Sequence, residues 1–113
     1  MKEDKALERF LRYVKIDTQS DENSSSSPST AKQLNLAKAL KEELEGLGMM
    51  VEIDRYGRVY SHLAGEKGLD VIGLNSHMDT ALECSGKDVK PQIIENYDGK
   101  DIRLNKDVTM SPK

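Results

Sequence analysis

A histidine and an aspartate two positions apart offer the clearest chemistry in this sequence. His77 and Asp79 lie in the hexapeptide 75–80, directly after the apolar run 71–74. On an extended segment, side chains two positions apart project to the same side, so this imidazole and this carboxylate can act together. A zinc-bound imidazole must be neutral and fixed in one tautomer, and a nearby carboxylate can orient it or tune a metal-bound water. The pair is therefore a candidate for such chemistry at the end of a strand.

A bare His-x-Asp pattern is weak, and a structural alternative stays open. In that alternative Asp79 accepts hydrogen bonds from neighbouring backbone N–H groups in a turn, and His77 is a half-buried structural histidine. The other histidine, His62, is interpreted as a surface or partly buried strand residue. Cys84 lies in a polar loop near Lys87, has no histidine placed to make it a nucleophile, and is interpreted as an incidental thiol.

Two helices are expected ahead of the His-x-Asp segment. Residues 4–16 carry apolar side chains at the i, i+3, i+4 and i+7 spacing of one helical stripe. Residues 19–29 form a Ser-rich polar run without periodic apolar positions, which predicts a mobile loop. Thr30 followed by Gln33 has the spacing of a capping box, so a second helix is predicted to begin there and to end at Gly48. The stripes are Leu7, Phe10, Leu11 and Val14 in the first helix and Leu36, Leu40, Leu44 and Leu47 in the second.

Strands are expected after the second helix. Residues 51–54 and 58–63 alternate apolar and polar around a turn at Tyr56-Gly57, which predicts a β-hairpin. Residues 71–74 are apolar throughout, as is typical of a central strand covered on both faces. Two short strands are predicted at 92–95 and 101–104, around an Asp98-Gly99 turn, and no closing helix or strand in the last four residues. The sequence thus predicts an α/β fold class with incomplete layers.

Composition narrows the function classes. A chain of 113 residues fits one domain at most, with an aliphatic core because it has one Phe and no Trp. Its 17 Lys and Arg against 20 Asp and Glu give a net charge of −3, and no basic stripe favours nucleic acid as a partner. No stretch resembles a membrane span or a signal segment, which predicts a cytoplasmic protein. A single cysteine excludes an internal disulfide and a cysteine zinc cluster.

Residues 76–112 carry a more specific pattern. They read SHMDT, then CSGKDVKPQIIENYDGKDIRL, then MSP, and this stretch closely resembles the peptidase T family of aminoacylase-like co-catalytic zinc exopeptidases. The SHxDT element is shared by the wider exopeptidase clan, whereas CSGK and PQIIENY point to this family in particular. The N-terminal LERFLRYVKIDTQSDE and the PST before the second helix are similar too, so the resemblance covers essentially the whole chain.

The resemblance implies a catalytic domain with two zinc ions that releases the N-terminal residue from tripeptides. It makes His77 a ligand to one zinc and Asp79 a catalytic residue that supports the metal site. The family's bridging Asp, general-base Glu with a neighbouring Glu ligand, further Asp ligand and distant His are expected beyond residue 113. Residues 1–113 are therefore expected to be the N-terminal portion of a metallopeptidase catalytic domain. That portion alone should be inactive and should not hold zinc tightly.

A second hypothesis belongs to a different class of function. The chain could be a non-catalytic truncated module that oligomerises or binds another protein through an open sheet edge. Under both hypotheses the apolar strand 71–74 lacks covering layers and neighbouring strands, which predicts a homo-oligomer. A reading frame that continues past residue 113 would favour the enzyme, and a stop codon there would favour the module.

Overall fold

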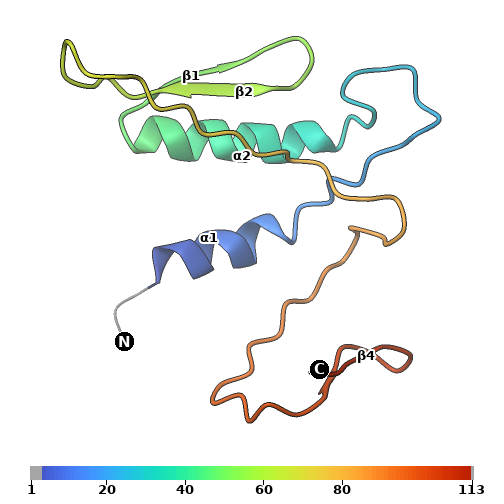
Figure 1. The fold of residues 1–113 in the computed structure, drawn as a ribbon. Coiled ribbons are helices and arrows are strands. Elements are labelled where there is room, and N and C mark those ends of the chain that lie inside the picture. Colours follow the sequence, from blue (N-terminus) through green and yellow to red (C-terminus); the bar gives the residue numbers. More distant parts are fainter. Residues whose placement is uncertain (1–3, 113) are drawn as a thin grey trace.

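The computed structural model describes residues 4–112, which form a mixed α/β chain (Figure 1). It contains two helices and two separate two-stranded antiparallel sheets. The elements are α1 (Lys5–Tyr13), α2 (Gln33–Gly46), β1 (Met50–Ile53), β2 (Val59–His62), β3 (Ile102–Arg103) and β4 (Thr109–Met110). Within these described residues, a helix with the length and apolarity needed to cross a membrane is absent.

The first predicted helix is confirmed as α1, which is shorter than residues 4–16. It begins after Asp4, whose side-chain oxygen accepts hydrogen bonds from the backbone N–H groups of Ala6 at 3.0 Å and Leu7 at 3.2 Å. Such side-chain acceptors satisfy backbone donors that the first turn leaves free. The apolar stripe is not buried, because Leu7 is 43% exposed and Phe10 is 59% exposed. In the described residues, the apolar side of α1 is therefore only partly covered, by residues 89–93.

The second predicted helix is confirmed as α2, but the capping box at its start is wrong. The helix begins at Gln33, and Lys32 at the cap position makes no side-chain cap hydrogen bond. The Thr30 hydroxyl donates to the carbonyl oxygen of Gln19 at 2.8 Å and accepts from Gln33 Nε2 at 3.1 Å, so it serves a long-range contact instead. At the other end Gly48 has φ of +83°, the left-handed conformation expected after a helix.

The predicted hairpin is confirmed as β1 and β2, with Ile53 opposite Val59 at the turn end. Asp54 holds the turn, because its Oδ1 accepts from the backbone N–H groups of Tyr56 at 2.9 Å and Arg58 at 3.0 Å. The hairpin lies along α2 (Figure 1). The buried apolar side chains of the described residues lie on α2. They are Leu36, 8% exposed, and Ala37, 0% exposed.

The predicted central strand at 71–74 is wrong. The segment is not a strand, and Val71, Ile72 and Leu74 are 89%, 86% and 96% exposed. Strand formation needs hydrogen-bonding neighbours, and in the described residues the two sheets consist only of β1 with β2 and β3 with β4. The apolar composition fits a buried strand, but residues 4–112 supply neither a paired edge nor a covering layer.

The C-terminal strands are only partly as predicted. Residues 92–95 are not a strand, and the predicted strand 101–104 is confirmed only as the two-residue β3. β3 pairs with β4, so a strand is present at Met110 where none was expected. The turn is not Asp98-Gly99 but the segment 104–108, where the Asn105 side-chain oxygen accepts from the backbone N–H groups of Asp107 at 2.8 Å and Val108 at 2.9 Å. The chain also bends at Asp98-Gly99, where the Lys100 N–H donates to Asp98 Oδ1 at 3.1 Å, but no strand pair of the described residues flanks that bend.

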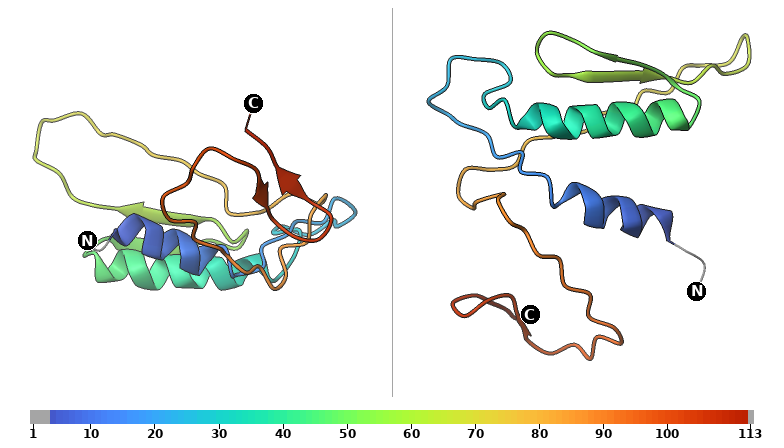
Figure 2. Two further views of the ribbon diagram at one scale, coloured as in Figure 1. Left: turned by 90° about the horizontal axis from the view of Figure 1, so that it is seen from below. Right: turned by 180° about the vertical axis from the view of Figure 1, so that it is seen from behind.

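The described elements do not close a common core. The solvent-accessible area is 9923 Å², against about 6200 Å² for a compact monomer of this mass. The radius of gyration is 17.7 Å, against about 13 Å for a compact chain of this length. Figure 2 shows the segment after residue 85 running away from α2 toward the terminal β-hairpin. The expectation of incomplete layers therefore matches the shape of the chain.

Candidate functional site

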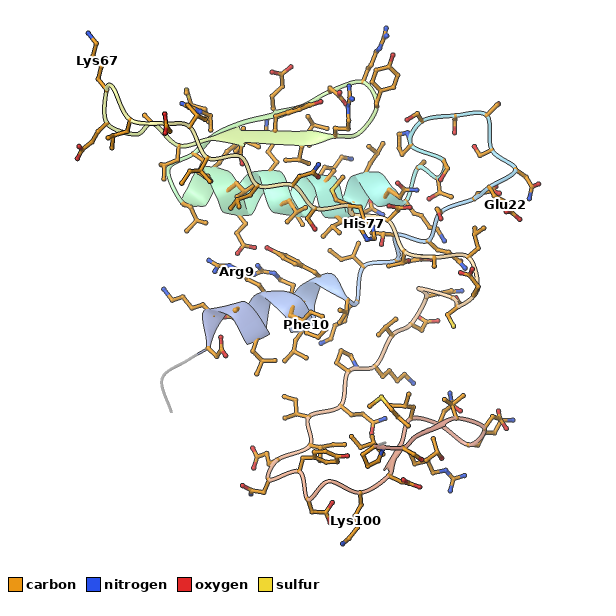
Figure 3. All side chains as sticks on the ribbon, in the orientation of Figure 1. Arg9, Phe10, Glu22, Lys67, His77 and Lys100 are labelled. Atoms are coloured by element: carbon orange, nitrogen blue, oxygen red, sulfur yellow. The ribbon has the colours of Figure 1, made fainter. Side chains whose placement is uncertain are left out.

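The structure brings His77 and Asp79 together. The His77 Nδ1 atom lies 2.8 Å from the backbone carbonyl oxygen of Asp79 and 3.2 Å from its Oδ1. A carbonyl oxygen only accepts hydrogen bonds, so Nδ1 carries the proton and the lone pair of the neutral ring is on Nε2. The His77 side chain is 83% exposed and projects from the segment that follows residues 71–74 (Figure 3). The half-buried histidine of the structural alternative is therefore not what the structure shows.

The described residues supply only part of a metal-ligand set. Among residues 4–112, there is no group of three or more His, Cys, Asp and Glu side chains that could hold a metal ion. His62 lies in β2 and is exposed, as interpreted from its strand position. Cys84 is an exposed free thiol. A catalytic zinc takes about three protein ligands, so His77 and Asp79 do not by themselves fit a zinc ion.

The chain directly after Asp79 is tied to residues 18–20. Thr80 forms an isolated parallel bridge with Gln19. The Thr80 backbone N–H donates to the Thr18 carbonyl oxygen at 3.1 Å, and the Ser20 N–H donates to the Thr80 carbonyl oxygen at 3.0 Å. Thr18 is only 3% exposed. These contacts are not predictable from the sequence, because residues 19–20 lie in a polar run and nothing in their periodicity points to residue 80.

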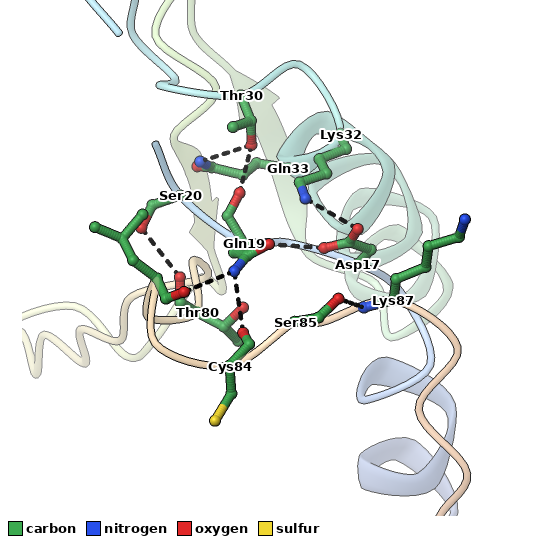
Figure 4. A network of polar contacts seen from close by, with 11 residues as sticks. Asp17, Gln19, Ser20, Thr30, Lys32, Gln33, Thr80, Cys84, Ser85 and Lys87 are labelled. Atoms are coloured by element: carbon green, nitrogen blue, oxygen red, sulfur yellow. Dashed lines mark hydrogen bonds and ion pairs between the residues drawn. The ribbon is translucent and has the colours of Figure 1, made fainter. Parts of the chain in front are cut away.

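A charged pair supports the same corner of the molecule (Figure 4). Asp17 Oδ2 accepts from Lys32 Nζ at 2.9 Å, and Asp17 Oδ1 accepts from the Gln19 backbone N–H at 3.1 Å. The Lys32 hydrogen bond, followed by that of Gln19, lowers the pKa of Asp17 below its usual value. A Cβ atom added at Gly86 would lie 2.9 Å from Asp17 Oδ1. A glycine therefore lets the turn after Thr80 approach this carboxylate.

The chain matches no protein-family model. It is 52% identical to peptidase T of Clostridium acetobutylicum over 97% of the chain and 28% of that protein. It is 52% identical to peptidase T of Clostridium perfringens strain 13 over 96% of the chain and 27% of that protein. The chain is homologous to the N-terminal quarter of peptidase T.

A third relative gives the same result. Peptidase T of Listeria monocytogenes serotype 4b is 50% identical over 100% of the chain and 28% of that protein. The chain thus spans a little over a quarter of the length of the curated relatives it matches. The resemblance drawn from the SHxDT, CSGK and PQIIENY stretches is confirmed by these comparisons.

An apolar cavity lies beside the His-x-Asp segment of this peptidase T homologue. It has a volume of about 430 Å³ and is lined by side chains of α1, α2 and residues 78–89, among them Tyr13, Leu36 and Met78. Thr80 and Gly86 also line it. The described residues therefore leave apolar space next to the candidate site, as they leave the segment 71–74 exposed.

A second polar cluster fixes α1 to α2. The Glu43 carboxylate on α2 accepts hydrogen bonds from Arg9, Arg12 and, at 2.5 Å, from the Tyr13 hydroxyl. Figure 3 shows Arg9 on the side of α1 that faces α2. The hydrogen bond from Tyr13, followed by that of Arg9, lowers the pKa of Glu43. Burial, followed by the bond to Glu43, raises the pKa of Tyr13. These polar and charged contacts thus tie α1 to α2, whereas the apolar stripe of α1 faces residues 89–93.

Proposed function

We propose that this chain supplies the N-terminal part of a peptidase T-like zinc aminopeptidase that releases the N-terminal residue from tripeptides. The observation that supports the proposal is the His77–Asp79 contact, found in a chain about half identical to peptidase T over nearly its whole length. In this proposal His77 binds one of two zinc ions through Nε2. Asp79 is the catalytic residue that supports the metal site.

The roles follow from the hydrogen bonding of the pair. Nδ1–H of His77 donates to the Asp79 carbonyl oxygen, which fixes the ring tautomer and leaves Nε2 available as a ligand. The Asp79 carboxylate, with its side chain 45% exposed, lies beside the ring, and its oxygens have lone pairs left to accept further hydrogen bonds. A bound zinc would polarise the scissile carbonyl and acidify a bound water. The remaining ligands and the general base would come from sequence outside residues 4–112.

A hybrid enzyme tests the proposal. This chain would replace the matching N-terminal quarter of Clostridium acetobutylicum peptidase T, and zinc-dependent release of the first residue from a tripeptide would be measured. His77→Ala should abolish the zinc-dependent activity, and Asp79→Asn should lower kcat by about 10²–10⁴-fold. His62→Ala is the matched control, because His62 is the other histidine and should tolerate the change. An active hybrid that is indifferent to His77→Ala would contradict the proposal.

The 113-residue chain alone should show neither aminopeptidase activity nor tight zinc binding. The reason is its donor set, because one imidazole with one carboxylate falls short of the ligands of a stable zinc site. Titration calorimetry should detect only weak, non-specific zinc uptake. Tight one-to-one binding would contradict this expectation and would require further ligands among the acidic residues.

A non-catalytic module is the second candidate function. It is favoured by the exposure of 71–74 and by the unpaired outer edges of β1 and β2 in the described residues. Such edges can pair with a strand of another chain. The genomic reading frame discriminates the two candidates, because sequence continuing past residue 113 with an Asp, a Glu-Glu pair, an Asp and a His would favour the enzyme.

A further inference from the structure

Gln19 joins two distant segments of the chain beside the His-x-Asp pair. Its side-chain Nε2 donates to the carbonyl oxygens of Leu82 at 3.0 Å and Cys84 at 3.1 Å, 63 and 65 positions away in the sequence. A primary amide nitrogen carries two N–H groups, so one side chain can bind both carbonyls at once. Figure 4 shows Gln19 between the two parts of this network.

The backbone of Gln19 is anchored on the helical side of the molecule. Its N–H donates to Asp17 Oδ1 at 3.1 Å, and Asp17 pairs with Lys32 next to α2 at 2.9 Å. Its carbonyl oxygen accepts from the Thr30 hydroxyl at 2.8 Å. Gln19 is thus held from the α2 side and itself holds the turn 80–84.

One peptide unit transmits this anchoring to the imidazole. The Asp79 carbonyl and the Thr80 N–H belong to the same planar peptide group, and in a trans peptide they point in opposite directions. The Thr80 N–H is bound to the Thr18 carbonyl oxygen at 3.1 Å. The Asp79 carbonyl oxygen therefore faces away from residue 18, where it meets His77 Nδ1 at 2.8 Å. The orientation of this peptide selects the proton-bearing nitrogen of His77.

We infer that Gln19 is a positioning residue that fixes the Asp79–Thr80 peptide and, through it, the Nδ1–H tautomer of His77. The inference rests on the proposed function only for the use made of the free Nε2 atom. The side-chain amide of Gln19 binds Leu82 and Cys84, which keeps the turn against residues 18–20. Without it the bridge at Thr80 loses its neighbouring support, and the ring loses its fixed acceptor.

Magnetic resonance of the 113-residue chain tests the inference without zinc or activity. Ring ¹⁵N shifts at alkaline pH report the tautomer of each neutral imidazole, and His62 serves as the internal reference. The unmodified chain should show the Nδ1–H form at His77. In Gln19→Met, which keeps the length but has no donor, the His77 shifts should move toward those of His62. Exchange of the Thr80 amide should rise about tenfold, the effect of losing one to two hydrogen bonds.

Two further variants separate positioning from folding. Gln19→Lys keeps donors near both carbonyls and should largely restore the His77 shifts and the Thr80 protection. Gln92→Met is the matched control, because Gln92 is an exposed glutamine, and it should change neither. In the hybrid enzyme, Gln19→Met should lower kcat more than it changes KM.

Several results would overturn the inference. They are the absence of the Nδ1–H form in the unmodified chain, unchanged His77 shifts in Gln19→Met, and unfolding of α2 in both Gln19 variants, which would make Gln19 a folding residue. Failure of the proposed function has a different signature, because it leaves the His77 shifts dependent on Gln19 while the hybrid is indifferent to His77→Ala.

Discussion

The hairpin of β1 and β2 and the segment 71–74 are both built from strand-forming residues, yet only the hairpin is a sheet. Ile53 lies opposite Val59 across a short turn closed by Asp54, so each strand finds its partner within a few residues. The segment 71–74 is more apolar, but Leu74 remains 96% exposed. Each strand of the hairpin has a partner nearby in the sequence, whereas a partner for residues 71–74 would have to come from a distant segment. Apolar composition therefore indicates that a segment needs a partner strand, but not whether the chain provides one.

The α2–hairpin unit and the His-x-Asp segment are also held in place by different kinds of contact. α2 and the hairpin pack along each other, and the buried apolar side chains of the described residues, Leu36 and Ala37, lie on α2. The His-x-Asp segment is instead held by polar contacts of Thr18, Gln19 and Ser20 with the chain at Thr80. Hydrogen bonds at a partly exposed corner contribute less than burial does. The candidate site should thus loosen before α2 and the hairpin separate.

Removing a buried side chain should have the largest effect on the stability of the chain. Leu36→Ala deletes a side chain that is 8% exposed and should lower the free energy of unfolding by about 2–3 kcal/mol. Leu74→Ala deletes the same atoms from the exposed segment and should change it by less than about 0.5 kcal/mol. Urea unfolding followed by circular dichroism measures both. Equal losses would show that 71–74 is buried in solution.

The hairpin turn gives the next largest effect. Gly57 has φ of +79°, and an added Cβ would meet Leu34 Cδ2 at 3.0 Å. Gly57→Ala should cost about 1–2 kcal/mol, because a side chain is strained in the left-handed region. Gly99→Ala is the matched control, since Gly99 has φ of +81° and nothing within 4 Å of the added Cβ. Both variants strain a left-handed residue, so both should shift the urea unfolding curve, and Gly57→Ala should shift it more because its Cβ also meets Leu34. Equal shifts would assign the whole effect to the backbone conformation.

Acid should release α1 from α2 with a smaller effect. Glu43 has a lowered pKa because it accepts hydrogen bonds from Tyr13 and the α1 arginines. Its folded pKa is below its unfolded value, so its stabilisation is present above the unfolded value and is lost as pH falls through the folded value. Helical circular dichroism should therefore decrease in an acid step. Glu43→Gln should remove that step, whereas Glu45→Gln should not.

Gly86 tests the contact between the site and residue 17 with a still smaller effect. A Cβ there would lie 2.9 Å from Asp17 Oδ1 and 3.4 Å from Thr80 Oγ1. Gly86→Ala should speed exchange of the Thr80 amide, because either atom must move. Gly65→Ala is the control, as nothing lies within 4 Å of its added Cβ. Unchanged exchange in Gly86→Ala would mean that the turn yields without disturbing the bridge.

Local patterns predicted the helices and the hairpin, whereas the second half of the chain depended on partners that no pattern reveals. The stripes and the Gly48 end signal of α1 and α2 are read within one or two helical turns. The prediction of a strand at 71–74 is wrong because strand pairing depends on two segments, and the pattern describes only one of them. The predicted capping box is wrong because the Thr30 hydroxyl donates to the carbonyl oxygen of Gln19, a contact that neither residue type predicts.

The contact between His77 and Asp79 could be predicted from the sequence, but the residues that hold this segment in place could not. His77 and Asp79 meet because a two-residue spacing on extended chain suffices for contact. The role of Gln19 could not be predicted, since its partners are backbone carbonyls at Leu82 and Cys84, which carry no side-chain signal. Long-range polar contacts of this kind become visible only once the chain is folded.

A substitution at Leu74 should have the smallest effect on the stability of a single copy of the chain, but a clear effect on association between copies. Leu74 is 96% exposed and Val71 is 89% exposed, so an aspartate at Leu74 loses no contact within one copy of the chain. Unpaired extended backbone with exposed aliphatic side chains favours pairing with another copy. We therefore expect the unmodified chain to form dimers or larger assemblies at micromolar concentration, and Leu74→Asp to shift them toward monomer. Light scattering measures both, with Lys67→Asp as a charge-changing control outside 71–74. A monomer at all concentrations, with a thermal transition independent of concentration, would show that the described elements close a core unaided.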